Sequence, residues 1–128
     1  MSRSISVFGL GYVGTVTAAC LAHMGHNVIG VDLSPTKVEA MQAGRSPIVE
    51  PRVGTLISEA HSASRLQATS DSAQAVMNSE ISFLCVGTPS LRNGKLDLGH
   101  IEPVCREIGE VHLDEGIVGD AEMALHLG

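Results

Sequence analysis

Three closely spaced glycines and one aspartate are the residues whose types and spacing could do chemistry. Gly9, Gly11 and Gly14 follow a short apolar run, and Asp32 ends a second apolar run roughly twenty residues further on. Glycine has no Cβ, so such a turn can bend tightly and let its backbone approach an anionic ligand. A carboxylate at the end of the second run can accept hydrogen bonds from a ribose. The combination predicts a dinucleotide site.

Each position in the glycine motif has its own predicted task. Gly9 permits the tight turn, Gly11 lets the backbone approach a pyrophosphate, and Gly14 lets the following helix pack against the strands. The N–H groups of Tyr12 and Val13 would meet the phosphate charge at the positive end of the helix dipole. These five residues form the predicted phosphate-binding turn.

Three further residues are predicted to surround the ligand. The Asp32 carboxylate would repel a 2′-phosphate, which favours NAD over NADP. Lys37 can reach the ribose or phosphate edge, or it is a solvated lysine on a helix. Thr88 follows a third apolar run and can offer a hydroxyl to the cofactor, or it is a plain loop threonine.

The elements that position these residues are read from apolar periodicity and from Gly, Pro and capping residues. Ser46 to Pro51 contains two prolines, which predicts an extended loop. Asp120 to Leu127 is a possible last helix. The remaining pattern predicts strands at 4–8, 27–31, 66–69 and 81–86, and helices at 12–23, 35–44, 53–62, 72–78 and 98–108.

Strands that alternate with helices indicate an α/β fold with a Rossmann-like doubly wound parallel sheet. A complete fold of this kind has six strands and needs a longer chain, so the sheet is predicted to be truncated. The carboxyl ends of parallel strands meet at one edge, so Gly9, Asp32 and Gly87 are expected together there. The predicted organisation is an NAD-binding Rossmann domain over residues 1–109 and an acidic tail of uncertain structure over residues 110–128.

Charge and composition exclude several classes of function. The net charge is −6, and residues 101–128 hold seven acidic side chains against Arg106 alone. An acidic chain without a basic stripe argues against nucleic acid or an anionic membrane as a partner. The six histidines show no convincing metal-ligand spacing, so no metal is expected.

The cysteines and the remaining polar residues predict no catalytic group. The three cysteines stand among apolar neighbours, which suits buried thiols in a reducing, cytoplasmic compartment. No apolar run approaches membrane-spanning length. The other candidates for acid or base chemistry lack a partner at a useful spacing and are interpreted as surface residues: Glu50, Asp97, His100 and Glu102.

Several segments taken together resemble the N-terminal NAD-binding domain of the UDP-glucose/GDP-mannose dehydrogenase family. The resemblance covers about residues 3–109 in order. Its segments are FGLGYVG (8–14), VIGVD (28–32), Lys37, SPIVEP (46–51), FLCVGTP (83–89), NGKLDL (93–98) and IEPVCREIG (101–109).

The resemblance implies a cytoplasmic, homo-oligomeric enzyme that oxidises the C6 hydroxyl of a nucleotide sugar to a carboxylate with NAD, through a thiohemiacetal on a catalytic cysteine. In alginate-producing members the product, GDP-mannuronate, feeds polysaccharide synthesis. The family pattern places cofactor contacts at Tyr12, Val13, Asp32, Lys37 and Thr88. Its catalytic cysteine lies in a C-terminal domain, so this chain alone is expected to bind NAD without turnover.

Two alternatives stay open at this point. One is a non-catalytic dinucleotide-sensing or interaction module, in which the bound ligand switches a partner. The other is a different hydride-transfer family with the same fold, such as a hydroxyacyl or phosphogluconate dehydrogenase, which the SPIVEP and VGTP segments disfavour.

Overall fold

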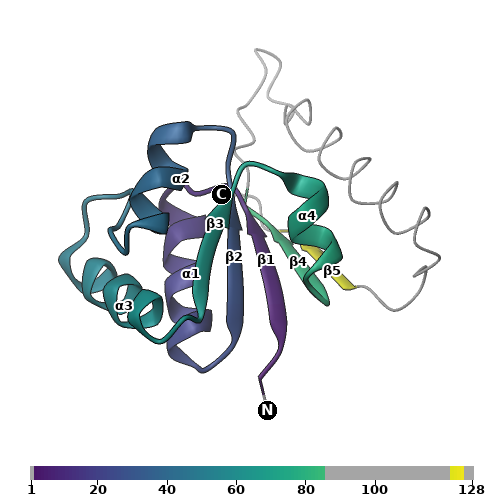
Figure 1. Cartoon of the computed structure of the whole chain (residues 1–128), viewed down its shortest axis with the longest axis horizontal. Coiled ribbons are helices and arrows are strands. Elements are labelled where there is room, and N and C mark those ends of the chain that lie inside the picture. The colour runs from purple at the N-terminus through teal and green to yellow at the C-terminus, as the bar shows by residue number, and fades with distance from the viewer. Residues whose placement is uncertain (1, 86–121, 126–128) are drawn as a thin grey trace, which may run out of the picture.

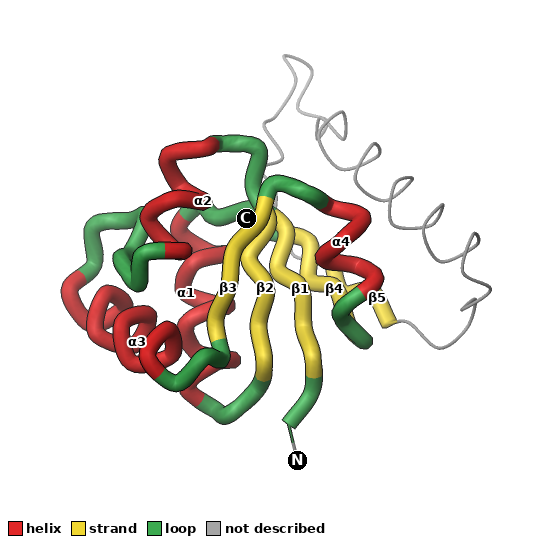
Figure 2. Tube along the Cα trace, in the orientation of Figure 1, coloured by secondary structure: helices red, strands yellow, loops and turns green. Residues whose placement is uncertain are grey.

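The computed structural model describes residues 2–85 and 122–125. Its described part is a parallel sheet in the order β3-β2-β1-β4-β5, with helices on both faces (Figures 1 and 2). The elements in chain order are β1 (Ser4–Phe8), α1 (Tyr12–His23), β2 (Asn27–Val31), α2 (Pro35–Gln42), α3 (Pro51–Ser62), β3 (Leu66–Thr69), α4 (Ser72–Met77), β4 (Ile81–Leu84) and β5 (Glu122–Leu125). The predicted α/β, Rossmann-like parallel sheet is therefore confirmed.

The central strand β1 is buried on both of its faces, as a strand between two helical layers should be. Side chains alternate along a strand, and Ile5 and Val7 join the core under α1, α2 and α3. Phe8 points the other way and joins the smaller core under α4. Ser6 is fully buried, and its hydroxyl lies 2.8 Å from that of Ser82 on β4. Figure 1 shows the two helical layers on either side of the sheet.

Helix α1 buries a face of small side chains. Ala18, Ala19 and Ala22 are each 0% exposed, so the helix axis can approach the sheet closely. Cys20 lies on the opposite face and is exposed, so the prediction that it is a buried thiol was wrong. The spacing of apolar residues identified the helix but not the face that packs.

The predicted start of the third helix needs correction. Pro51 was assigned to an extended loop, but it is the first residue of α3, where a proline N–H would have had no partner in any case. The Glu50 side chain caps this helix by accepting a hydrogen bond of 3.2 Å from the Arg52 N–H.

The possible helix at residues 120–127 was also wrong, because Glu122–Leu125 is a strand parallel to β4. An open strand edge has unpaired backbone groups, and a neighbouring strand satisfies them as a helix cannot. β4 ends at Leu84, so the strand predicted at 81–86 is too long at Cys85, which the structure describes outside the strand. Val86 and the predicted helix at 98–108 lie outside the described residues.

Candidate dinucleotide-binding site

The carboxyl ends of the strands are in register at one edge of the sheet. Phe8 pairs with Val31 on β2 and with Leu84 on β4. The next residues along the two central strands, Gly9 and Asp32, therefore meet at this edge, as predicted. Chain order reverses here, since β2 and β4 flank β1, and ligands of doubly wound sheets bind at such a switch point. Gly87, the third residue expected at this edge, lies outside the described residues.

Two glycines of the turn are required by the protein itself. Gly9 has a φ of +99°, which side chains of L residues rarely adopt. A Cβ on Gly14 would lie 1.6 Å from the Gly9 carbonyl oxygen, so only glycine lets α1 pass this close to the turn. The contact fixes the start of α1 against the end of β1.

Gly11 is different, because nothing in the described chain requires a glycine there. Its φ is −77°, which any residue can adopt, and a Cβ at this position would meet nothing within 4 Å. The residues that the structure describes therefore leave the space in front of Gly11 open. A ligand that needs close contact with the backbone is the physical reason left for glycine at this position.

The start of α1 also differs from the starts of the other described helices. The side chains of Ser34, Glu50 and Asp71 accept a backbone N–H at the starts of α2, α3 and α4. Helix α1 has Gly11 as its N-cap and no side-chain cap. The first N–H groups of a helix have no intrahelical partner, so those of α1 are available to an anion.

Asp32 is bound within the protein at both of its carboxylate oxygens. Oδ2 accepts a hydrogen bond of 2.7 Å from the Leu10 N–H, and Oδ1 accepts one of 2.8 Å from the Ser34 N–H. A carboxylate offers about four lone-pair sites, so capacity remains for ribose hydroxyls. The sequence predicted that Asp32 binds the ribose and repels a 2′-phosphate, but it did not reveal this role within the protein.

Leu10 and Thr15 are site residues that reasoning from the sequence missed. Both are 0% exposed, and the Thr15 hydroxyl donates a hydrogen bond of 3.1 Å to the Leu10 carbonyl. The only signal in the sequence was a hydroxyl residue directly after the third glycine, which by itself does not reveal its acceptor.

The remaining predicted residues are placed as follows. Tyr12 is 62% exposed and Val13 half-buried at the first turn of α1. Lys37 is half-buried in the first turn of α2, and its N–H donates to the Ser34 hydroxyl at 3.4 Å. Thr88 lies outside the described residues. The structure thus brings Gly9, Gly11, Tyr12, Val13, Gly14 and Asp32 to one edge, with Lys37 on the helix that starts there.

Cys85 directly follows β4 and is not a candidate nucleophile. Burial raises the pKa of its thiol, and a hydrogen bond with the Thr17 side chain opposes this only in part. A thiol with a raised pKa stays protonated at neutral pH, whereas nucleophilic attack needs the thiolate. This agrees with a packing role for Cys85.

The described part of the chain holds no group of three or more His, Cys, Asp or Glu residues that could bind a metal ion. Among the described helices, none has both the length and the apolar character needed to cross a membrane.

A parallel strand, glycine turn, helix and strand with an acidic residue at the end define a Rossmann-like dinucleotide-binding domain. Comparison with protein families names the group within that class. The model for the UDP-glucose/GDP-mannose dehydrogenase family, NAD binding domain, matches residues 3–119. The chain belongs to this family, and its cofactor is NAD.

Individual relatives agree with this assignment. GDP-mannose 6-dehydrogenase from Pseudomonas aeruginosa is 57% identical over 105 residues, which is 82% of this chain and 24% of the relative. UDP-glucose 6-dehydrogenase AglM from Haloferax volcanii is 38% identical over 106 residues, which is 83% of this chain and 24% of the relative.

Solved structures show the same likeness. The ternary complex of GDP-mannose dehydrogenase from P. aeruginosa superimposes with a TM-score of 0.82 at 55% identity, over 85% of this chain and 25% of that one. A UDP-glucose dehydrogenase from Pyrobaculum islandicum gives a TM-score of 0.85 at 38% identity, over 91% and 27% of the two chains. This chain therefore spans about a quarter of the length of its relatives.

Proposed function

We propose that this chain is the cofactor-binding part of a nucleotide-sugar 6-dehydrogenase that oxidises GDP-mannose to GDP-mannuronate in two NAD-dependent steps. The observation that carries the proposal is the open backbone at Gly11, beside a helix start that no side chain caps. The identity of 57% to a GDP-mannose 6-dehydrogenase supports GDP-mannose as the substrate over UDP-glucose.

In this proposal the residues of the turn bind and orient the cofactor, and NAD supplies the hydride acceptor. The N–H groups of Tyr12 and Val13 donate to the pyrophosphate, where the positive end of the α1 dipole adds to the attraction. Asp32 accepts from the adenosine ribose through its remaining lone pairs and repels a 2′-phosphate. Lys37 is proposed to contact the ribose or phosphate edge, and Thr88 is proposed to offer its side-chain hydroxyl to the cofactor.

The proposal extends to the organisation and the setting of the protein. We propose that residues 1–109 form the main part of the NAD-binding domain and that residues 110–128 form an acidic tail, within which Glu122–Leu125 adds β5 to the sheet of that domain. We also propose a cytoplasmic homo-oligomer that serves polysaccharide synthesis such as that of alginate, without nucleic acid or membrane partners. The unpaired thiols of Cys20 and Cys85 support a reducing compartment.

The substitution Gly11→Ala tests the site in the 128-residue chain. The added Cβ meets no atom of the described residues within 4 Å, but it would occupy the place of the pyrophosphate. Isothermal titration should show NAD affinity at least about tenfold weaker, while the free energy of unfolding falls by no more than about 1 kcal/mol, the usual effect of alanine at an N-cap.

Gly54→Ala is the matched control. Gly54 lies within α3, and its added Cβ also meets nothing within 4 Å, so NAD affinity should not change. Equal affinity in wild type and Gly11→Ala would contradict the proposed site.

A second measurement separates the dehydrogenase from a non-catalytic sensing module. The isolated chain should bind NAD and form no NADH with GDP-mannose. It spans only 24% of the length of the P. aeruginosa GDP-mannose 6-dehydrogenase, so most of such an enzyme has no counterpart in it. Robust oxidation of GDP-mannose by the isolated chain would contradict the proposal that it only binds the cofactor. A partner protein captured only in the presence of NAD would favour the sensing module.

A further inference from the structure

Leu10 stands between the first two glycines of the turn, and the protein holds it at three points. Its N–H donates to Asp32 Oδ2 at 2.7 Å, and its carbonyl accepts from Thr15 Oγ1 at 3.1 Å. Its side chain is 0% exposed and packs so tightly that a Cβ on Gly30 would lie 2.9 Å from Leu10 Cδ2. Neither the backbone nor the side chain of Leu10 is free to move alone.

The first of these bonds connects the turn to the neighbouring helix. Asp32 Oδ1 accepts from the Ser34 N–H at 2.8 Å, and the Ser34 hydroxyl in turn accepts from the Lys37 N–H at 3.4 Å. One carboxylate therefore fixes the turn relative to the start of α2. The charged acceptor makes the two bonds to Asp32 stronger than bonds to a neutral acceptor would be.

The second bond connects the turn to α1. Thr15 follows Gly14 directly, is 0% exposed, and also donates its backbone N–H to the Gly11 carbonyl at 3.0 Å. Threonine is only a modest helix former. The hydrogen bond of its hydroxyl to Leu10 therefore explains why a threonine stands in the first turn of α1. Thr15 thus sets the position of both Leu10 and Gly11.

We propose that Asp32 and Thr15 are positioning residues, whose bonds to Leu10 fix the phosphate-binding turn before the cofactor arrives. We call these two bonds the Leu10 clamp. A turn held in its binding geometry loses less conformational entropy when NAD binds, which raises affinity without any new contact to the ligand. The inference rests on the proposed NAD site, and it gives Asp32 a task that does not involve the ribose.

Thr15 allows the cleaner test, because its hydroxyl bonds to Leu10 and not to the ligand. Thr15→Val keeps the shape and removes the hydroxyl, whereas Thr15→Ser keeps the hydroxyl. Isothermal titration of the full chain should show NAD affinity about threefold to tenfold weaker in Thr15→Val, the size of one hydrogen bond. The NAD affinity of Thr15→Ser should stay within about twofold of the wild-type affinity.

A fragment of the cofactor separates positioning from general loss of structure. Adenosine carries the ribose but no phosphate, and its weak binding can be followed by NMR chemical shifts. Thr15→Val should leave the adenosine affinity unchanged, since the clamp acts on the phosphate turn. Equal losses for NAD and adenosine, or equal NAD affinity in Thr15→Val and Thr15→Ser, would overturn the proposal.

Asp32→Asn gives the corresponding test at the other bond, with inorganic pyrophosphate as the probe. If Asp32 served only the ribose, loss of its negative charge would leave pyrophosphate binding unchanged or tighter. The clamp predicts weaker pyrophosphate binding, because the turn loses its charged acceptor. Unchanged or tighter binding would overturn the role assigned to Asp32.

Hydrogen exchange in the ligand-free wild type needs no variant to fold. The Leu10 and Ser34 amides should exchange at least about tenfold more slowly than those of Tyr12 and Val13, which precede the first bond within α1. Fast exchange at Leu10 would overturn the clamp even where wild type binds NAD. Failure of wild type to bind NAD would instead contradict the proposed function, so the two failures are distinguishable.

Discussion

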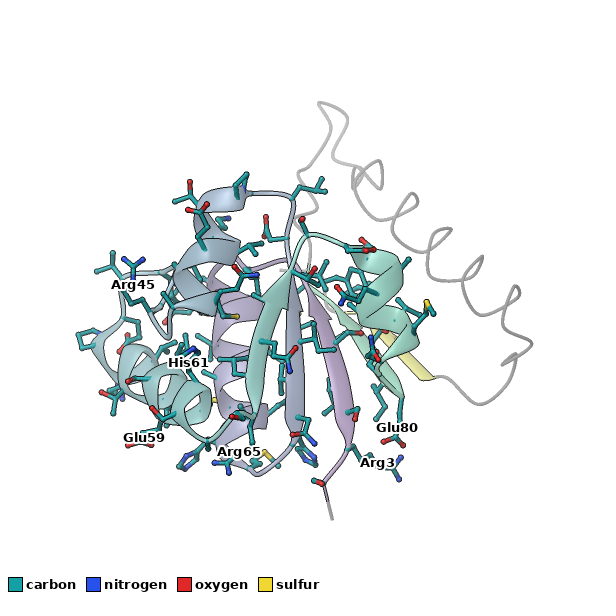
Figure 3. All side chains as sticks on the ribbon, in the orientation of Figure 1. Arg3, Arg45, Glu59, His61, Arg65 and Glu80 are labelled. Atoms are coloured by element: carbon teal, nitrogen blue, oxygen red, sulfur yellow. The ribbon has the colours of Figure 1, made fainter. Side chains whose placement is uncertain are left out.

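The two ends of the central strand β1 treat the backbone groups beside them in opposite ways. At the amino end, Glu80 accepts a bond of 3.3 Å from the Ser4 N–H and lies 3.5 Å from the Arg3 guanidinium, and the His26 ring accepts the Arg3 N–H at 3.0 Å. Figure 3 shows Arg3 and Glu80 side by side at this end. At the carboxyl end, the start of α1 has no side-chain cap.

The difference shows how one fold separates stability from binding. The side chains of Glu80 and His26 at the amino end complete hydrogen bonds that a strand end would otherwise leave to water. At the carboxyl end, hydrogen bonds to the buried Leu10 fix the turn, and the first N–H groups of α1 are left for a ligand. Substitutions at the two ends should therefore separate stability from NAD affinity.

Gly14→Ala should have the largest effect, because it should lower both the stability of the protein and its affinity for NAD. The added Cβ would lie 1.6 Å from the Gly9 carbonyl oxygen, so α1 or the turn must move. Overpacking costs about 1–3 kcal/mol in the free energy of unfolding and occasionally more, and a clash with a backbone oxygen should place Gly14→Ala at the upper end of this range. Urea denaturation should show this loss, and NAD binding should fall with it.

Gly54→Ala serves as the control for this prediction too. A helical glycine with open space around its Cβ position should gain about 0.5–1 kcal/mol when alanine replaces it. Wild-type stability in Gly14→Ala would mean that α1 does not depend on close contact with Gly9.

The part of the site that the sequence revealed is the part made of local geometry. Glycines at fixed spacing after an apolar run identify a turn, and Gly9 and Gly14 have the backbone reasons expected of them. The order of strands and helices followed from periodicity in the same way, including the short strand β3. These features depend on residues close together in the chain.

The missed features depend on contacts that local patterns do not encode. The bond from Leu10 to Asp32 joins residues 22 positions apart, and no local rule predicts which N–H a carboxylate will meet. The buried face of α1 was missed because alanine carries a weak apolar signal although it allows the closest packing. Strand β5 was missed because its pairing with β4 is a tertiary contact that overrides helical preference.

Glu80→Gln should have a small effect that is confined to the amino end. It removes the charge that faces Arg3, but both side chains are about half exposed, at 53% and 54%. Exposed ion pairs contribute about 0.2–1 kcal/mol, so the free energy of unfolding should fall by less than about 1 kcal/mol, and less at high salt.

NAD affinity should not change in Glu80→Gln, since the substitution lies at the far end of the strands. Glu59→Gln, on the exposed surface of α3, is the charge-matched control and should change neither quantity. A loss of NAD affinity in Glu80→Gln alone would show that the two ends are coupled.

The smallest effect concerns a single thiol at the carboxyl end. In a Cys105→Ser background, iodoacetamide labelling at pH 8 should modify the exposed Cys20 first and Cys85 slowly. Burial raises the pKa of Cys85, so less thiolate is present at this pH than for an ordinary cysteine, and its rate should rise only at higher pH. Mass spectrometry of labelled peptides across pH 7–10 measures both rates. If Cys85 reacted as fast as Cys20 at pH 8, its thiol would be neither protonated nor shielded, and the carboxyl end would hold a nucleophile beside the glycine turn.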